Sequence, residues 1–517
     1  MIKSTNAKFR KSIVLYILGL LVLINRFFIL KEFNFQYTGT DDLVFWQAAV
    51  DYSQGIFHEP YFYGQDYNFA LESILAVPLL LIGIPAFIAL PLVSSFVGIF
   101  PFFVLAIALF RKGFTNDAFL FLLIPLAMPI EYDIITSVSR GFTSGLFFCS
   151  FLIFPLLSPT KIKSFIILGL AVSFGYIFNA NSLILSFPIC LYLLFKNYKS
   201  PYFYLLGLAA TIPAFLILYF SKEFYINHPE FLTHSMWGLD FKFARVVYGL
   251  SHLDDFFRYL TPVLWSGNWL VLLIILFLAI ATLKKNWKKG VSLLLNLLFI
   301  VVLLGITKIH DDAGVIFLSS TRMFLAIPLL FGVALFWTKK DFIDENKLRL
   351  IIATVGISVF FVKISSYETV IKEHTEETNY GAIAIKKIDD LKVECSEIND
   401  IATNYDVDLL VFIPNYRYNT PYMISYNLGC SIIEEQMTSS VMSTYERRTW
   451  VFEKEKNTAR KTVLLYNLNI DETKEYDKFI DYEFIKGKPN MVLVRNNDKT
   501  LFELSKVFDF RLMRSTY

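Results

Sequence analysis

Two adjacent carboxylates, Asp41 and Asp42, stand shortly after the first long apolar run of the chain ends. An uncompensated charge in the hydrocarbon core of a bilayer costs roughly 2.5–3.5 kcal/mol even on lenient scales, so acids in such a place need polar surroundings. One chemistry that suits them is general base catalysis, in which a carboxylate accepts or orients the proton of an incoming hydroxyl group. Two neighbouring acids also permit two roles, one toward the acceptor and one toward a hydroxyl or a cation.

The same residues suit the start of a helix. Thr40 is then the N-cap, the two acids lie in the first turn, and Leu43, Phe45 and Trp46 form the buried stripe. The two interpretations are compatible, because a helix N-terminus holds a carboxylate in a fixed position.

Further polar and aromatic residues follow within the next thirty positions or so. Aromatic side chains at this place fit an aromatic belt at the lipid headgroups as well as stacking on a sugar. Glu72 lies at the edge of an apolar segment, where a carboxylate is costly unless it is paired. We predict that the substrate is bound by Tyr63, Gln65, Asp66 and Glu72.

A phosphate group on the substrate requires cations, and the planar guanidinium of arginine binds two phosphate oxygens at once. The candidates are Arg140, Arg258 and Arg322, together with His310. Arg140 and Arg322 fit equally well as arginines that extend to the membrane interface. Arg258 follows Asp254 and its neighbouring acid, so a surface ion pair is its structural alternative.

Divalent ions prefer carboxylate oxygens, which the sequences His310-Asp311-Asp312 and Asp41-Asp42 supply. This spacing does not define a ligand set. We therefore predict no metal site and no cofactor, while a divalent cation stays possible.

Composition excludes a soluble enzyme of this length. Of the 517 residues, 55% are hydrophobic and 18% are charged, as in a polytopic α-helical membrane protein. Apolar runs predict about eleven spans. They lie at residues 12–31, 87–110, 116–132, 141–158, 163–180, 182–197, 201–221, 266–283, 290–307, 321–338 and 347–364.

Lys/Arg clusters between these runs fall on the same side as the N-terminal basic cluster if residues 69–84 do not cross the membrane. Positive-inside bias then predicts a cytoplasmic N-terminus and a first external loop at 31–85. The first apolar run is long enough to span and lacks a small-residue cleavage site, so we expect an uncleaved first helix. Residues 69–84 are accordingly predicted as an interfacial segment, with a true span as the alternative. A small outer loop is expected around residues 131–140.

Residues 1–364 thus form the transmembrane domain, and 365–517 form an extracytoplasmic α/β domain with strands at 408–413, 462–466 and 490–494 and helix between 383 and 405. In an oxidising compartment Cys395 and Cys430 are candidates for a disulfide, although sequence does not show that they are close. The segment 445–450, dense in Arg and aromatics, suits an acceptor or ordinary packing.

Four motifs carry a resemblance to a known family. Asp41-Asp42, Tyr63-Gly-Gln-Asp-Tyr67, Ser139-Arg-Gly-Phe142 and Ser320-Thr-Arg-Met-Phe324 resemble those of GT-C superfamily glycosyltransferases, in particular the bacterial group related to protein O-mannosyltransferases and to the lipid A aminoarabinose transferase. The resemblance covers most of residues 12–364. It implies that Asp41 is the catalytic acid group. Asp42 stands where Glu is common in the family, and Asp66 replaces a Pro.

The resemblance implies transfer of a sugar from a polyprenyl-phosphate donor, by one inverting displacement, to an acceptor protein, lipid or glycan at the outer face of a bacterial cytoplasmic (inner) membrane. Membrane lipid is then a partner and nucleic acid is not. Two alternatives stay open. One is a transporter or flippase for a lipid-linked sugar, although the chain lacks the paired halves typical of transporters. The other is a non-catalytic envelope-assembly protein.

Overall fold

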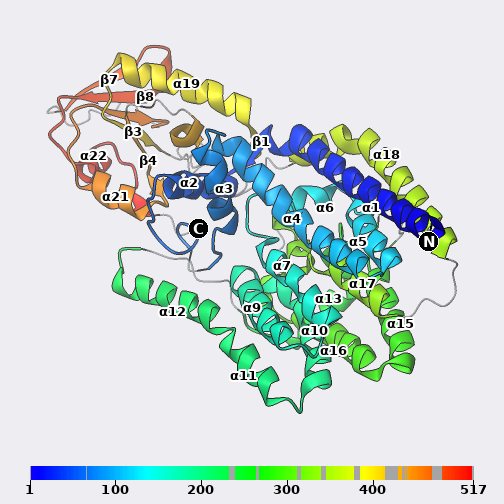
Figure 1. The fold of residues 1–517 in the computed structure, drawn as a ribbon. Helices are drawn as coiled ribbons and strands as arrows, with labels where there is room; N and C mark the ends of the chain where they lie inside the picture. The colour runs from blue at the N-terminus through cyan, green and yellow to red at the C-terminus, as the bar shows by residue number, and fades with distance from the viewer. Residues whose placement is uncertain are drawn as a thin grey trace. The chain divides into compact units, whose positions relative to one another are not determined.

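The computed structural model describes residues 2–65, 67–231, 239–262, 267–310, 316–338, 345–377, 385–413, 429–433, 437, 439–468 and 480–514. The chain is mostly helical, with a mixed β-sheet in its C-terminal part (Figure 1). It forms two compact units. Unit 1 comprises residues 1–34, 91–220 and 236–374, and unit 2 comprises residues 35–90, 221–235 and 375–517.

Six helical segments in the described part of the chain are long and apolar enough to cross a membrane, as in a multi-pass membrane protein. Each overlaps one of the predicted spans, and the last begins and ends later in the chain than the predicted 347–364. They are Lys11–Asn34, Ala86–Arg111, Ala180–Asn197, Pro201–Asn227, Ser320–Trp337 and Thr354–Thr375.

The other predicted spans are helical but shorter. The longest are α9 (Ile162–Phe178) and α16 (Trp287–Leu303), each of 17 residues. At 1.5 Å per residue they extend about 26 Å, close to the roughly 30 Å of a hydrocarbon core. The shorter helices are α5 (Thr115–Ala127), α7 (Ser144–Cys149), η2 (Ser150–Leu152), α8 (Ile153–Leu157), α9 (Ile162–Phe178), α15 (Leu270–Lys285) and α16 (Trp287–Leu303).

The segment predicted to lie at the interface forms α3 (Leu71–Leu81), a helix of 11 residues with Pro78 inside it. Its length of about 16 Å is half of what a crossing requires. α3 packs against α2 (Thr40–Ser53), and Ser73 Oγ donates to the Phe45 carbonyl at 2.7 Å.

Neighbouring helices pack in pairs within unit 1, among them α15 with α16 and α10 with α16. The remaining helices of the chain outside its C-terminal part are α1 (Ile2–Ile29), η1 (Leu30–Asn34), α4 (Ala86–Arg111), α6 (Ile130–Ile135), η3 (Ala180–Ser182), α10 (Leu183–Asn197), α11 (Pro201–Ala209), α12 (Ile212–Asn227), α13 (Phe243–Ser251), α14 (Leu253–Phe256), η4 (Thr307–His310), η5 (Ile316–Leu318), η6 (Ser320–Phe324), α17 (Ile327–Trp337) and α18 (Glu345–Glu377).

The residues expected to form a small outer loop at 131–140 begin with the short helix α6, and Asp133 is fully buried there. Asn25 Nδ2 donates to Asp133 Oδ2 at 2.9 Å, Arg26 Nη1 donates to its backbone carbonyl at 2.8 Å, and Lys363 pairs with its carboxylate. The acid is buried because it binds side chains of α1 and α18 together.

Unit 2 contains a five-stranded sheet in the order β4-β3-β6-β8-β7. β3 is parallel to β4 and β6, whereas β8 is antiparallel to β6 and β7. The three predicted strands are confirmed as β3, β6 and β8. The sheet consists of β3 (Leu409–Phe412), β4 (Ser440–Ser443), β6 (Val463–Tyr466), β7 (Asp481–Ile485) and β8 (Lys488–Arg495).

Helices cover both faces of this sheet (Figure 1). Alternate strand residues point to opposite sides, so Leu410 and Phe412 join the core under α19 (Ile388–Asn404) while Leu409 and Val411 join the other core. That second core includes residues of α21 (Thr449–Lys456) and α22 (Leu501–Val507). The predicted helix of the α/β part is confirmed as α19.

A disulfide joins Cys395 of α19 to Cys430, with Cα atoms 5.2 Å apart, inside the first of these cores. Cys149 and Cys190 are free thiols.

A two-stranded sheet fixes the start of α2. β1 (Tyr37–Gly39) runs antiparallel to β2 (Ile385–Lys387), and the Ile388 amide donates to the Gln36 carbonyl at 2.8 Å. A second small sheet pairs β5 (Tyr445–Glu446) with β9 (Met513–Arg514). α2 therefore begins at a strand that pairs with the C-terminal part of the chain.

Candidate functional site

Asp42 stabilises the first turn of α2. The N-cap is Gly39 and not Thr40, and Asp42 Oδ2 accepts the Gly39 amide at 3.0 Å. The prediction of Thr40 as N-cap is wrong by one residue, because the acid at the third helical position reaches back to the residue before Thr40. Asp42 is buried and has this structural role.

Asp41 forms an ion pair with Arg447, whose Nη1 lies 3.3 Å from Asp41 Oδ1. The side chains are 15% and 8% exposed, so the pair is largely shielded from solvent. The Arg447 guanidinium also lies over the ring of Phe62, 6.0 Å from its centre. The residue that holds Asp41 thus comes from the segment 445–450, which the sequence singles out but does not connect with Asp41.

The neighbouring arginine has a different partner. Arg448 binds Glu446 through two hydrogen bonds, Nε to Oε1 at 2.9 Å and Nη2 to Oε2 at 3.0 Å. Burial alone raises the pKa of Glu446, but the Arg448 charge, its hydrogen bonds and the Ser443 amide outweigh burial and hold that pKa below its ordinary value. Arg448 therefore neutralises a buried acid of its own segment, whereas Arg447 pairs with Asp41.

Asp51 lies further along α2, and its carboxylate is surrounded by three polar side chains. Tyr63 OH donates to Asp51 Oδ2 at 2.7 Å, and Gln47 Nε2 donates to Oδ1 at 2.8 Å. His58 Nε2 is 3.8 Å from Asp51 Oδ2. Tyr63, a predicted binding residue, is buried with its hydroxyl on this carboxylate.

The ring of His58 lies flat on Trp450, with centres 3.5 Å apart, and Tyr63 meets the same indole edge-on at 4.8 Å. Burial lowers the pKa of His58, with Arg448 acting in the same direction and Asp51 opposing it. Burial thus favours the neutral form of the His58 ring. Sequence reasoning did not name His58 as a site residue. It singled out the segment 445–450 that contains Trp450, but not the contact between the two rings, which spans most of the chain.

Gln65 and Glu72 are buried in unit 2, and Asp66 lies outside the described residues. A further buried carboxyl belongs to Glu59, which accepts a hydrogen bond from Tyr225 OH at 2.9 Å. Burial raises the pKa of Glu59 to about 8, against the lowering effect of Tyr225 and of the Gly64 amide.

The predicted cations lie in unit 1. Arg140 and Arg322 contact Phe317, and the Arg258 backbone contacts Thr321. Arg140 is buried over the ring of Phe317, 4.9 Å from its centre. Arg322 Nη1 donates to the Phe317 carbonyl at 3.4 Å, and Thr321 Oγ1 donates to the Arg258 carbonyl at 2.9 Å.

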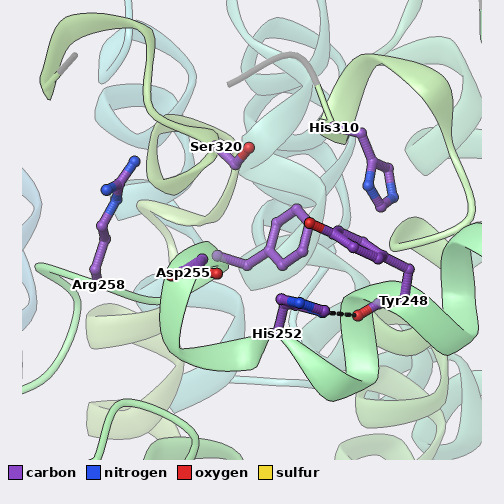
Figure 2. A pocket seen from close by; sticks show the side chains of 7 residues that line it. Tyr248, His252, Asp255, Arg258, His310 and Ser320 are labelled. Atoms are coloured by element: carbon purple, nitrogen blue, oxygen red, sulfur yellow. Dashed lines mark hydrogen bonds between the residues drawn. The ribbon is translucent and has the colours of Figure 1, made fainter. Parts of the chain in front are cut away.

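A cavity with a volume of about 500 Å³ lies in unit 1, and Arg258 and His310 both line it (Figure 2). The other lining residues are Tyr248, His252, Asp255, Phe256 and Ser320. The structure thus brings two of the predicted binding residues together in unit 1.

The predicted site residues divide between the two units. Unit 2 holds Asp41, Asp42, Tyr63, Gln65 and Glu72, and unit 1 holds Arg140, Arg258, His310 and Arg322.

Within the described ranges, no three His, Cys, Asp or Glu side chains are grouped so that they would hold a metal ion. Asp311 and Asp312 lie outside those ranges.

No protein-family model matches the sequence, and comparison with curated proteins finds no match. Function is therefore inferred from the motifs and from the geometry of the two units.

Proposed function

We propose that this protein is a membrane glycosyltransferase of GT-C type, which transfers a sugar from a polyprenyl-phosphate donor to an acceptor at the outer face of a bacterial cytoplasmic membrane. One observation carries the proposal. Of the two adjacent acids, Asp42 stabilises the start of α2, whereas Asp41 is held by Arg447 in the first turn of that helix. Asp41 is thus the acid assigned to chemistry.

The reaction is one inverting displacement. The acceptor oxygen attacks the anomeric carbon, the bond between that carbon and the phosphate oxygen breaks, and its electron pair leaves with the lipid phosphate. The acceptor proton passes to the Asp41 carboxylate. Arg447 fixes the carboxylate through a charge-assisted hydrogen bond, which keeps its oxygens in one orientation.

The helices of unit 1 support the membrane part of the proposal. Beyond the six long apolar segments, we infer that the shorter helices of up to 17 residues also cross, which brings the total close to the predicted eleven. Arg140, Arg258 and Arg322 are the candidates for binding the leaving phosphate, since guanidinium groups stay charged near lipid.

The disulfide between Cys395 and Cys430 supports an extracytoplasmic location for the sheet of unit 2, because disulfides persist in oxidising compartments. β1 and Arg447 connect the start of α2 to that part of the chain, so Asp41 belongs on the same side.

The test measures release of radiolabelled sugar from polyprenyl-phosphate monosaccharides by the purified full-length protein with an envelope extract as acceptor source. Asp41→Asn keeps the size and the hydrogen-bonding oxygen but loses the base, so transfer should fall by about 10²–10⁴-fold. Asp42→Asn should retain transfer with a small loss of stability. Undiminished transfer by Asp41→Asn removes Asp41 from the mechanism.

Exchanging the charges of Asp41 and Arg447 distinguishes a catalytic role of Asp41 from a purely structural one. The double variant Asp41→Arg with Arg447→Asp restores an ion pair but places no acid on α2, so it should fold and stay inactive. Recovered transfer would assign the pair a structural role alone. Glu397→Gln is the matched control, because it breaks an exposed pair with Lys488 in the same unit and should change neither property.

A transporter is distinguished by the same preparation. If wild-type protein moves the donor across vesicle membranes without releasing sugar, and Asp41→Asn does so equally, the proposed reaction is wrong.

A further inference from the structure

The cavity of unit 1 has the size of a small-molecule pocket. Its volume of about 500 Å³ falls within the range of roughly 300–1,000 Å³ found for such sites. Figure 2 shows His310 and Tyr248 on one side of it and Arg258 on the other. Four of the seven lining side chains carry rings, and the other three are polar.

The rings form continuous walls. Tyr248 and His252 stack with centres 4.0 Å apart and planes at 17°, and His310 meets Phe256 edge-on at 5.1 Å. His310 also packs against Tyr248 at 5.8 Å. Such walls suit a ligand that presents aliphatic C–H groups on its faces.

Each histidine has one ring nitrogen committed to the backbone. His252 Nδ1 lies 2.9 Å from the Tyr248 carbonyl, and His310 Nε2 lies 2.6 Å from the Leu304 carbonyl. A carbonyl only accepts, so these two nitrogens carry the protons, and in the neutral ring the other nitrogen of each is an acceptor.

The hydroxyl group of Ser320 is a second observation, separate from the rings, that indicates a ligand. Its side chain is buried, with 3% of the residue exposed, and within the described ranges its hydroxyl has no hydrogen-bond partner. It lines the cavity. A buried hydroxyl without a partner is costly, so a ligand that offers hydrogen bonds at this point is favoured.

The balance of donors and acceptors decides the ligand class. Asp255 presents acceptors, Arg258 presents donors, and the hydroxyls of Tyr248 and Ser320 do both. A phosphate has only acceptor atoms when fully ionised and would face the Asp255 carboxylate. A sugar hydroxyl both donates and accepts, and a sugar ring carries C–H groups on its faces.

We propose that this cavity binds the ring of a neutral sugar. The proposal rests on the proposed function, since the sugar is then that of the lipid-phosphate donor or that of an acceptor glycan. Ser320 and Asp255 bind hydroxyls at the edge of the ring, and Tyr248 and Phe256 pack against it.

Saturation-transfer NMR on the full-length protein in detergent tests this without any transfer reaction. The probes are the methyl glycosides of mannose, glucose, galactose and xylose, with inorganic phosphate as the anionic probe. At least one glycoside should receive saturation at its ring protons, and Ser320→Ala should reduce the effect at least fivefold. Asp255→Asn, at an exposed position where folding is not at stake, should reduce it as well.

Ser150→Ala is the matched control, because Ser150 is buried in unit 1 with its hydroxyl bound to the Phe147 carbonyl at 2.6 Å. It should leave glycoside binding unchanged. Absence of signal from every glycoside, or equal signals in wild type and both cavity variants, overturns the proposal. Phosphate binding that both variants abolish, without glycoside binding, overturns it in favour of an anion site.

Competition identifies the source of the sugar. Displacement of the glycoside by citronellyl-phosphate mannose, a short-chain donor, assigns the cavity to the donor sugar. Displacement by a free disaccharide and not by that donor assigns it to the acceptor glycan. Either result supports a sugar site, and binding that persists while Asp41→Asn remains fully active separates this proposal from the proposed function.

Discussion

Lys363 and Asp133 form an ion pair in unit 1 in which the two side chains are 2% and 0% exposed. Arg26 is a second cation at the same carboxylate, 3.6 Å from Asp133 Oδ1. Asp133→Asn leaves two buried cations without an anion, so it should lower the free energy of unfolding by about 3–5 kcal/mol. Thermal unfolding of the purified protein in detergent measures the loss.

Lys363→Met provides the comparison for this pair. It removes one of the two cations while Arg26 still pairs with Asp133, so its cost should be clearly smaller than that of Asp133→Asn. Equal costs would mean that the charge balance of this cluster does not govern its stability.

The pair Glu446–Arg448 should carry more of the stability of unit 2 than the pair Asp41–Arg447. Arg448→Met leaves the buried Glu446 without its cation and should cost about 3–5 kcal/mol, whereas Arg447→Met faces a partly exposed acid and should cost less. Urea unfolding followed by circular dichroism orders the two variants. The reverse order would contradict the assignment of Arg448 as the structural arginine.

The pH dependence of Glu446 follows from the direction of its pKa. That pKa is lowered from its ordinary value of 4.5, so the contribution of Glu446 is complete above pH 4.5 and is lost as the pH falls below it. Glu446→Gln should flatten this acid limb of the unfolding temperature. An unchanged acid limb in that variant would remove Glu446 as its source.

Glu59 predicts a pH effect of opposite sign. Its pKa is raised from 4.5 to about 8, so between these values the unfolded chain has lost a proton that the folded chain keeps, and stability should fall as the pH rises. Above about pH 8 this dependence ends. Unfolding temperatures of wild type and Glu59→Gln from pH 5 to 8.5 measure it.

The Gln side chain keeps the hydrogen-bonding shape of protonated Glu59 and does not titrate. Relative to wild type, Glu59→Gln should therefore gain stability as the pH rises through this range, and Asp498→Asn, at a surface acid of the same unit, should not. Parallel curves for wild type and Glu59→Gln would show that Glu59 is not the titrating group.

The disulfide should be visible in the purified protein. Alkylation of the denatured chain without reductant should label Cys149 and Cys190 only, and reductant should add Cys395 and Cys430. The bond closes a loop with a sequence separation of 35 residues, so the double variant Cys395→Ala with Cys430→Ala should lose about 3–4 kcal/mol in the chain-entropy model. Four thiols labelled without reductant would contradict the bridge.

Local patterns determined the elements of this protein. Apolar runs of about twenty residues located the six long apolar segments, and short apolar runs located β3, β6 and β8. These signals are carried by residues close together in the chain, so the sequence contains them completely. Residue type alone likewise made Arg258 and His310 candidates for binding a substrate, and the structure places both in one cavity.

The partners of the acids were decided by the tertiary structure alone. Asp41 and Arg447 are 406 positions apart, and Asp133 meets Lys363 across 230 positions. No local period relates such residues, because an ion pair depends on where the folded chain brings two side chains and not on their spacing. The sequence therefore identified the acids and the arginines as candidates. Only the tertiary structure shows that Asp42 stabilises a helix start and that Asp41 pairs with a guanidinium.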